Sequence, residues 1–333
     1  MEVVTEVALG KGDVSLAALG KFCGRTYELI DQVWRSDRSN PPERQQAKQD
    51  FVDLMRDHTW IVTIACIAYT LFVHFGPALI RRPWPVKGVL AAWNLALAVF
   101  SAFGAWHCLS GLVANMAAQG WRYTVCTQPK MIDLAGTDLD VWACFFVLSK
   151  IFEFFDTVLK IVLQKQFIFL HWYHHLATAW LCWISLAYDF APGTWIAAVN
   201  YSVHAPMYTY YFASSVLNKK WFTRLCKPVA PFITTFQTTQ MAMFTVVNCS
   251  AVYYLYFEEP RAPCSITPFN LYANAAVVLS YFVLFALLFV DKYIRRSPSD
   301  CCDVQLPEEL SAQLSMKAKG KGKGKGGKAK KAD

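Results

Sequence analysis

Seven long apolar segments dominate the pattern of hydrophobic and polar positions along this chain. Each is about 20 residues or longer, the length that a helix needs to cross the hydrocarbon core of a bilayer. They lack the alternation with a period of two that is typical of membrane strands. The pattern therefore predicts an all-α, polytopic membrane protein with seven transmembrane helices, at residues 59–80, 88–109, 139–164, 167–188, 194–217, 228–257 and 270–294.

These segments divide the chain into three parts. Residues 1–58 precede the first span, residues 59–296 form the seven-span domain, and residues 297–333 form a tail rich in lysine and glycine. The formal net charge of the chain is +8. The eight lysines and one acid from Lys317 to Asp333 supply +7 of that charge, which leaves only +1 for the remaining residues. The body of the protein is therefore not a basic nucleic-acid binder, and we expect no nucleic-acid partner.

Basic residues in the loops predict the orientation of the chain. They gather in alternate loops, which the positive-inside rule places in the cytosol together with the C-terminus. Because seven is an odd number, residues 1–58 are then expected in the lumen, with the first span as signal anchor. The basic loop residues are Arg81, Arg82, Lys87, Lys165, Lys219, Lys220, Arg224, Lys227, Lys292, Arg295 and Arg296.

The last residues of the chain match a targeting signal. They read Lys330-Lys331-Ala332-Asp333, and lysines at the third and fourth positions from the end of a cytosolic tail form the dilysine signal for retrieval to the endoplasmic reticulum. Chance is the alternative, because adjacent lysines arise easily in a low-complexity run. We expect a multi-pass protein of the endoplasmic reticulum membrane, whose tail also contacts anionic lipid.

The third span carries ionisable residues at membrane depth. Lys150, Glu153 and Asp156, followed by Thr157, lie on one face of the expected helix. Such residues cost about 2.5–3.5 kcal/mol each on insertion scales, so they indicate function by default. The alternative is a structural ion pair between Lys150 and Glu153, which is compatible with a functional role.

The next three spans carry further polar residues. Counted at about 1.5 Å per residue, they fall in the same layer as the charges of the third span, between mid-membrane and the cytosolic face. The fifth span also contains Pro206, which is expected to kink it. For the amides, interhelical hydrogen bonding is the alternative role. The residues are His171, His174 and His175 on one face of the fourth span, Asn200, His204 and Tyr208 in the fifth, and Thr234, Gln237 and Gln240 in the sixth.

The pattern His-x-x-His-His at residues 171–175 also suggests a metal site. Di-iron centres of membrane desaturases and hydroxylases draw on more histidines than this layer supplies, however, and a zinc site seldom takes three ligands from one helical turn. The histidine cluster has no cysteine beside it. Imidazole can itself act as base or nucleophile near neutral pH, so we expect a site that works through histidine, with no bound metal or cofactor.

Four motifs in a fixed order resemble those of a known family. Together they are similar to the ELO family of very-long-chain fatty-acid elongases, the membrane 3-oxoacyl-CoA synthases, over residues 59–296. The motifs are Lys150-x-x-Glu153-x-x-Asp156-Thr157, His171-Trp172-Tyr173-His174-His175, Asn200-x-x-x-His204-x-x-Met207-Tyr208-x-Tyr210-Tyr211 and Thr234-x-x-Gln237-x-x-Gln240.

The resemblance implies an acyltransferase reaction. A long-chain acyl-CoA condenses with malonyl-CoA to a 3-oxoacyl-CoA, carbon dioxide and CoA, and a ketoacyl reductase, a dehydratase and an enoyl reductase complete the cycle. The implied fold is a barrel of six helices, from the second span to the seventh, around a substrate tunnel whose lumenal end limits the chain length. A homodimer is a further expectation. The Trp172-Tyr173 pair and the run from Asn200 are similar to the branch that elongates saturated and monounsaturated chains, whereas Phe155 departs from that branch and, with Phe154, is expected to narrow the tunnel.

The resemblance also implies roles for individual residues. His174 takes the acyl chain as an acyl-imidazole, and His204 positions or activates the reacting carbonyl or carbanion. Gln237 and Gln240 donate to a developing oxyanion. The remaining catalytic residues are expected to be His171, His175, Lys150, Glu153 and Asp156, the last two as partners that orient imidazoles. The expected substrate-binding residues are Asn200, Tyr208, Tyr211, Thr157 and Thr234. The phosphates of CoA are expected to bind Lys165, Lys219, Lys220, Arg224 and Lys227. Positive-inside topology alone also explains the positions of these five basic residues.

Two cysteines fall in loops that the topology places in the lumen. Because that compartment is oxidising, and because the family pattern suggests it, Cys126 and Cys264 are expected to form a disulfide. Two other functions stay open. A seven-helix transporter or receptor would use the buried charges as a proton relay, and a di-iron desaturase or hydroxylase would use the histidines as ligands.

Overall fold

Helices account for the secondary structure of the computed structural model, which describes residues 13–35, 41–127, 138–188, 190–258 and 264–295. Within these ranges no strand forms, and one isolated bridge joins Phe190 to Ile266, so the expectation of an all-α protein is confirmed. By its internal contacts the chain divides into residues 1–286 and residues 287–333. The second unit is described through residue 295, where a π-helical turn, Val290–Arg295, follows the end of α12.

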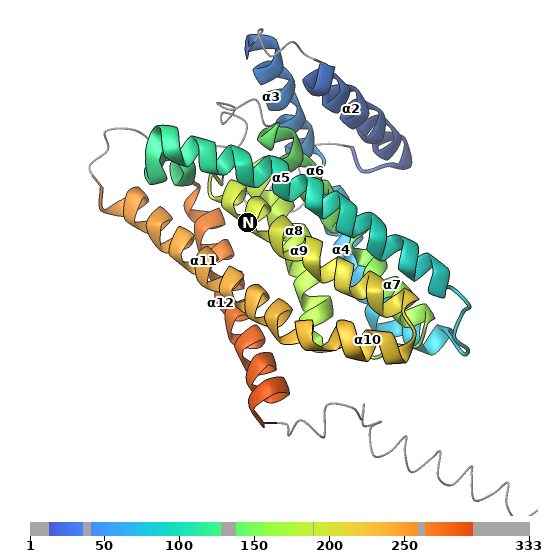
Figure 1. The fold of residues 1–333 in the computed structure, drawn as a ribbon. Coiled ribbons are helices and arrows are strands. Elements are labelled where there is room, and N and C mark those ends of the chain that lie inside the picture. Colours follow the sequence, from blue (N-terminus) through green and yellow to red (C-terminus); the bar gives the residue numbers. More distant parts are fainter. Residues whose placement is uncertain (1–12, 36–40, 128–137, 189, 259–263, 296–333) are drawn as a thin grey trace, which may run out of the picture. The chain divides into compact units, whose positions relative to one another are not determined.

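Each predicted span contains a helix. A short helix, α10 (Lys219–Leu225), and a 3₁₀ turn (Lys227–Val229) connect the fifth predicted span to the sixth. The helices of the spans are α4 (Trp60–Leu79), α5 (Lys87–Cys126), α6 (Leu139–Phe152) with α7 (Phe154–Val162), α8 (Phe169–Ala187), α9 (Gly193–Val216), α11 (Ala230–Tyr256) and α12 (Pro268–Phe289), as Figure 1 shows.

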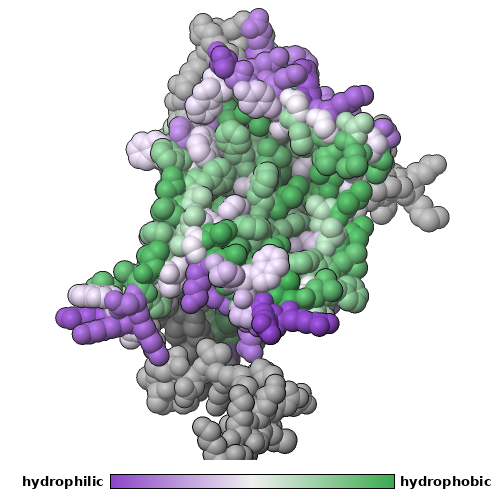
Figure 2. Space-filling view, turned by 90° about the vertical axis from the view of Figure 1, so that its right-hand side faces the viewer, coloured by the Kyte–Doolittle hydropathy of each residue, from purple (hydrophilic) through white to green (hydrophobic). Residues whose placement is uncertain are grey.

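Three of the described helices, α4, α5 and α12, are long and apolar enough to cross a membrane. Apolar side chains such as Ile67, Trp106 and Leu279 are exposed on them, as expected for surfaces that face lipid. Figure 2 shows a face on which apolar residues form a broad band, with hydrophilic residues at both ends. The protein is therefore a multi-pass membrane protein.

The third predicted span is not one continuous helix. It is divided at Glu153 into α6 and α7, because the backbone N–H of Asp156 donates to the carbonyl of Glu153, only three residues earlier, at 3.0 Å. This tight turn lies in the middle of the charged motif. Lys150 lies before this turn and Asp156 after it, and Glu153 at the turn keeps right-handed helical angles of φ −62° and ψ −15°.

The second predicted span extends well beyond residue 109. Helix α5 continues to Cys126 because residues 110–119 include leucine, alanine and methionine, which favour a helix. Gly120 then adopts φ 81° and ψ 175°, a conformation that residues with a Cβ rarely reach, and kinks the helix before its last turns. The kink places Cys126 beside the loop that contains Cys264.

Helices α5 and α9 lie side by side (Figure 1). A Cβ atom added to Gly104 would lie 2.6 Å from the ring of Tyr201, so the crossing requires a glycine at that position. Tyr201 is 2% exposed, and its hydroxyl donates to the carbonyl of Trp142 on α6 at 3.1 Å. This close approach fixes α9, which carries Asn200 and His204, against the rest of the core.

One end of the helices is tied together by covalent and backbone bonds. The structure joins Cys126 to Cys264 by a disulfide, and the N–H of Ser265 donates to the carbonyl of Cys126 at 2.9 Å. The N–H of Ala191 donates to the carbonyl of Ser265 at 3.0 Å. The ends of α5, α8 and α11 therefore meet at what we call the disulfide end.

The opposite end carries exposed basic residues and is called the basic end. Its loops are joined by hydrogen bonds from the N–H of Trp84 to the carbonyl of Val162 at 2.9 Å and from Nε2 of Gln164 to the carbonyl of Ile80 at 2.8 Å. Three basic side chains lie outside the described part, namely those of Lys227, Lys292 and Arg295. Residues 296–333, which include the dilysine sequence, also lie outside it. The exposed residues of this end are Arg81, Arg82, Lys87, Lys165, Lys219, Lys220 and Arg224.

The N-terminal segment contains two helices, α2 (Leu16–Arg35) and α3 (Pro41–Asp57), which pack against each other. We call them the N-terminal hairpin. Ala18, Phe22 and Leu29 are buried along one stripe of α2, the pattern of an amphipathic helix. Because α3 leads into α4, the hairpin lies at the opposite end of α4 from the basic end, together with the disulfide.

Candidate active site

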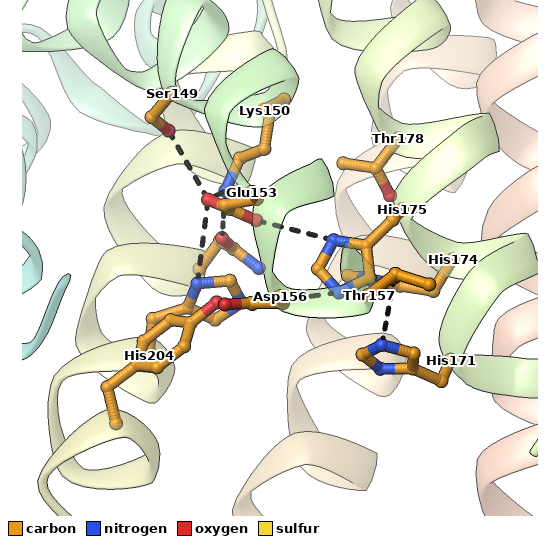
Figure 3. A network of polar contacts seen from close by, with 12 residues as sticks. Ser149, Lys150, Glu153, Asp156, Thr157, His171, His174, His175, Thr178 and His204 are labelled. Atoms are coloured by element: carbon orange, nitrogen blue, oxygen red, sulfur yellow. Dashed lines mark hydrogen bonds and ion pairs between the residues drawn. The ribbon is translucent and has the colours of Figure 1, made fainter. Parts of the chain in front are cut away.

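Polar side chains from α6, α7, α8 and α9 point toward one another in the interior (Figure 3). The structure thereby brings the charged residues and histidines of three predicted spans into one cluster. The labelled members are Ser149, Lys150, Glu153, Asp156, Thr157, His171, His174, His175, Thr178 and His204.

Glu153 lies at the centre of this cluster. Nζ of Lys150 is 2.6 Å from Oε1 of Glu153 and also donates to Oδ1 of Asn200 at 3.1 Å. The hydroxyl of Ser149 donates to the same Oε1 at 3.3 Å. Lys150 and Glu153 are each 3% exposed, so neither charge would be tolerated here without the other. The structural ion pair considered from the sequence therefore exists within the site.

Two imidazoles face the carboxylates at ion-pair distance. Nδ1 of His175 lies 3.9 Å from Oε2 of Glu153, and its Nε2 lies 3.8 Å from Oδ2 of Asp156. Nδ1 of His204 lies 4.0 Å from Oε1 of Glu153. These distances are too long for hydrogen bonds. They still allow the carboxylates to stabilise a positive charge that develops on either ring.

Asp156 is held in place by two strong hydrogen bonds. Nε1 of Trp93, on α5, donates to Oδ1 at 2.6 Å, and the hydroxyl of Tyr208, on α9, donates to Oδ2 at 2.6 Å. Each oxygen thus has its own donor, and bonds to an ionised acceptor are about twice as strong as neutral ones. The carboxylate is fixed in one orientation beside His175.

His171 uses both ring nitrogens in hydrogen bonds. Nζ of Lys160 lies 3.2 Å from Nδ1, and Oγ1 of Thr157 lies 3.1 Å from Nε2. Because an ammonium group only donates, Nδ1 accepts from it, and the Nε2–H donates to Thr157. The hydroxyl of Tyr69 lies 2.8 Å from the same Thr157 oxygen and completes the chain. His171 is therefore a structural partner in the cluster, with no nitrogen left for a substrate.

His174 has a different environment. Its ring nitrogens have no hydrogen-bond partner among the residues that the structure describes, and the side chain borders an apolar cavity. The hydroxyl of Tyr281 donates to the backbone carbonyl of His174 at 3.1 Å. Oγ1 of Thr178 forms a hydrogen bond with the same hydroxyl at 2.9 Å. The ring of His175 lies 5.5 Å away, edge to face. Of the three histidines at residues 171–175, His174 alone borders this cavity.

The cavity is apolar, with a volume of about 80 Å³. Along α8 it extends from His174 to Leu186, which corresponds to about 18 Å at 1.5 Å per residue. It runs toward the disulfide end, since α8 begins at the basic end. Its lining residues are Val52, Ala143, Phe146, Val147, His174, Thr178, Leu181, Cys182, Ser185, Leu186, Phe190, Gly193, Ile196, Ala197, Asn200, Gln240, Met241, Phe244, Asn274, Val277, Val278 and Tyr281.

The amide and hydroxyl residues predicted for the site differ in whether they border the cavity. Asn200 and Gln240 border the cavity, and Oε1 of Gln240 has no hydrogen-bond partner among the described residues although the side chain is buried. Nε2 of Gln237 donates instead to the sulfur of Met207 at 3.1 Å, and Oγ1 of Thr234 donates to a carbonyl of its own helix. Gln240, rather than Gln237, is the amide that reaches the cavity.

Several predicted residues lie away from the cavity. Tyr211 is 40% exposed, and its ring contacts that of Tyr208. Phe154 stacks on Tyr69 with ring centroids 4.1 Å apart, while Phe155 packs edge-on against Trp93. Neither phenylalanine borders this cavity. Lys165, Lys219, Lys220 and Arg224 are exposed at the basic end, and the side chain of Lys227 lies outside the described part.

The cluster includes residues that the sequence did not single out. Ser149 and Lys160 lie four residues from Glu153 and Asp156 respectively, so helical spacing alone identifies them as neighbours. Tyr69 and Trp93 come from α4 and α5, and no local pattern marks them. In the described ranges, no group of three or more histidine, cysteine, aspartate or glutamate side chains has the arrangement of a metal site.

Comparison with known proteins gives consistent matches. The family model "ELO: GNS1/SUR4 family" matches residues 54–300. "Very long chain fatty acid elongase 4" of Trypanosoma cruzi is 34% identical over 243 residues, which cover 72% of this chain and 82% of that protein. "Fatty acid elongase 3" of Trypanosoma brucei brucei is 34% identical over 270 residues, 74% of this chain and 87% of that protein. "Very long chain fatty acid elongase 6" of Homo sapiens is 34% identical over 254 residues, 76% and 91% of the two chains.

Proposed function

The chain belongs to the ELO (GNS1/SUR4) family, and on this premise we propose how it performs fatty-acid elongation. It is a very-long-chain 3-oxoacyl-CoA synthase. Its substrates are a long-chain acyl-CoA and malonyl-CoA, and its products are a 3-oxoacyl-CoA with two more carbons, carbon dioxide and CoA. The similar proteins are elongases rather than transporters, receptors or desaturases, so those alternatives are not favoured.

One observation supports a covalent mechanism through His174. Its ring is the imidazole at residues 171–175 that borders the apolar cavity, and its nitrogens have no partner among the described residues. The cavity extends away from it by about 18 Å along α8, which suits an extended acyl chain. A fatty chain in this cavity would place its carboxyl carbon beside a nucleophilic nitrogen.

In the first half-reaction, a ring nitrogen of His174 attacks the thioester carbonyl of the acyl-CoA. The carbon–nitrogen bond forms, the carbon–sulfur bond breaks, and the proton of the imidazole passes to the departing thiolate, so that CoA leaves as a thiol. The acyl-imidazole holds the chain on a good leaving group. Gln240 and Asn200, which border the same cavity, are placed to donate to the oxyanion.

In the second half-reaction, malonyl-CoA loses carbon dioxide and its carbanion attacks the acyl-imidazole carbonyl. The carbon–carbon bond forms, the carbon–nitrogen bond breaks, and the departing imidazolate of His174 takes up a proton from water. His204, beside Glu153, positions or activates the malonyl group. Glu153 and Asp156 stabilise the positive charge that forms on His175 and His204 during proton transfer.

The proposal also includes the arrangement of the helices in the membrane and the orientation of their two ends. Seven helices cross the membrane, and six of them form a barrel around the cavity: α5, α6 with α7 counted as one, α8, α9, α11 and α12. The disulfide end and the N-terminus lie in the lumen, and the basic end lies in the cytosol of the endoplasmic reticulum membrane. Lys165, Lys219, Lys220, Arg224 and Lys227 hold the phosphates of CoA there. His174 lies about 8 Å along α8 from the first residue of that helix, at 1.5 Å per residue.

The assembly and the substrate range complete the proposal. No cofactor is bound during the reaction. A ketoacyl reductase, a dehydratase and an enoyl reductase act on the product in the same membrane, and two copies of the chain form a homodimer. Saturated and monounsaturated chains are the preferred substrates.

An elongation assay tests this function. Membranes that contain the protein are incubated with labelled malonyl-CoA and a series of acyl-CoAs. We expect label in acyl products with the wild-type chain and with His74→Ala, since His74 is exposed on α4 and bonds only to the carbonyl of Thr70 among the described residues. His174→Ala should incorporate none. If the wild-type chain incorporates no label with any acyl-CoA, the proposed function is wrong.

A further inference from the structure

The N-terminal hairpin contributes to the wall of the apolar cavity. Val52, on α3, is 3% exposed and lines the cavity together with residues from α6, α8, α9, α11 and α12. The family model begins at residue 54, and every other lining residue lies inside it. Among the described residues, Val52 is therefore the one contact with the cavity from outside the region that the family model matches.

Val52 lies at the far end of the cavity from His174. The cavity continues along α8 to Leu186, past the end of that helix to Phe190, and onto the first residue of α9, Gly193. Phe190 is bridged to Ile266 at the disulfide end. Helix α3 packs against α8 at this end, because Nε1 of Trp183 donates to the carbonyl of Met55 at 3.0 Å.

Buried ion pairs hold the hairpin in this position. Nη2 of Arg44 lies 2.8 Å from Oδ1 of Asp138 and 3.4 Å from Oδ1 of Asp140, and Lys48 pairs with the other oxygen of Asp140. The side chains of Arg44 and Lys48 are 5% and 6% exposed. Both basic residues are on α3, and both acids lie at the start of α6. An element that is fixed by desolvated charges keeps a defined boundary for the cavity.

We propose that the N-terminal hairpin closes the far end of the acyl cavity and that Val52 limits the length of the acyl chain that the protein accepts. The inference rests on the proposed function, because it takes the cavity to hold the acyl group carried by His174. With the carboxyl carbon fixed at His174, the methyl end of the longest accepted chain contacts Val52. A change in side-chain volume at this position then changes the acceptable length without touching the reacting atoms.

Paired substitutions at Val52 test the proposal. The kcat/KM of each variant is measured with labelled malonyl-CoA over a series of saturated acyl-CoAs that differ by two carbons. Val52→Phe should lower kcat/KM for the longest accepted substrate by about 10-fold or more and leave shorter substrates nearly unchanged, because one methylene in an apolar pocket is worth about 10- to 200-fold. Val52→Ala should raise kcat/KM for a substrate beyond the wild-type limit.

Val33 provides the matched control. It is a valine of the same hairpin, 6% exposed, and it does not border the cavity. Val33→Phe and Val33→Ala should leave the length profile unchanged, whatever they do to stability. If Val52→Phe does not fold, the opposite shift expected of Val52→Ala still decides the question.

The outcomes separate this inference from the proposed function. If the wild-type chain elongates acyl-CoAs but both Val52 variants keep its length profile, the hairpin does not limit chain length. Equal shifts from the Val33 variants would show that the hairpin acts only through overall stability, and they would also overturn the proposal. If the wild-type chain elongates nothing, the proposed function itself is wrong and this inference with it.

Discussion

Lys150 and Glu153 form an ion pair with an Nζ–Oε1 distance of 2.6 Å, and their side chains are only 3% and 4% exposed. The pair lies at the tight turn that divides α6 from α7, and Glu153 also faces His175 and His204. A buried pair of this kind balances the cost of placing either charge at membrane depth. It therefore places a paired carboxylate beside the imidazoles that carry out the proposed chemistry.

Removing the ammonium group should destabilise the protein. In Lys150→Met the carboxylate of Glu153 stays buried without its partner, which typically costs about 3–5 kcal/mol. The measurement is thermal unfolding of the purified protein in detergent. The double variant Lys150→Met/Glu153→Leu should recover most of the lost stability and still lack activity. If the double variant is as active as the wild-type chain, the carboxylate has no part in the reaction.

Trp93→Phe should impair catalysis more than stability. The substitution removes the N–H that holds Asp156 at 2.6 Å and keeps an aromatic ring against Phe155. Hydrogen bonds to charged groups contribute about 1.5–3 kcal/mol, so kcat should fall by roughly 10- to 100-fold. Trp106→Phe, on the exposed face of the same helix, is the control and should behave like the wild-type chain. An unchanged kcat in Trp93→Phe would show that the orientation of Asp156 does not matter.

Gly104→Ala should destabilise the crossing of α5 and α9. The added Cβ would lie 2.6 Å from the ring of Tyr201, and such overpacking usually costs about 1–3 kcal/mol. Gly88→Ala is the matched control on the same helix, because no atom lies within 4 Å of the added Cβ. The midpoint of thermal unfolding in detergent should fall for Gly104→Ala and hold for Gly88→Ala. Equal midpoints for the two variants would contradict the described packing.

The sequence predicted the parts of the fold that depend on local pattern. Long apolar runs predicted the helices, and the residues at 150–156 and 171–175 predicted which faces are polar, because both signals repeat within one helix. The division at Glu153 was not predicted, since no proline or glycine marks it. The extension of α5 to Cys126 was also missed, because the apolar pattern indicates where a helix enters lipid and not where its hydrogen bonds end.

The site was predicted less completely than the helices. Trp93 and Tyr69 complete the contacts of Asp156 and Thr157, but they come from helices that only the tertiary fold brings near. The distinction between Gln240 and Gln237 depends on the rotation of α11, which the spacing of two amides on one stripe cannot supply. The contribution of Val52 depends on how the hairpin docks, and the composition of residues 1–58 does not predict that.

The central claim is that His174 carries the acyl chain, and its most direct test is mass spectrometry of the protein after incubation with acyl-CoA alone. Without malonyl-CoA the second half-reaction cannot proceed, so the peptide that contains His174 should gain the mass of the acyl group while CoA is released. His174→Ala should gain nothing. An adduct on a cysteine, or full elongation activity in His174→Ala, would contradict the account.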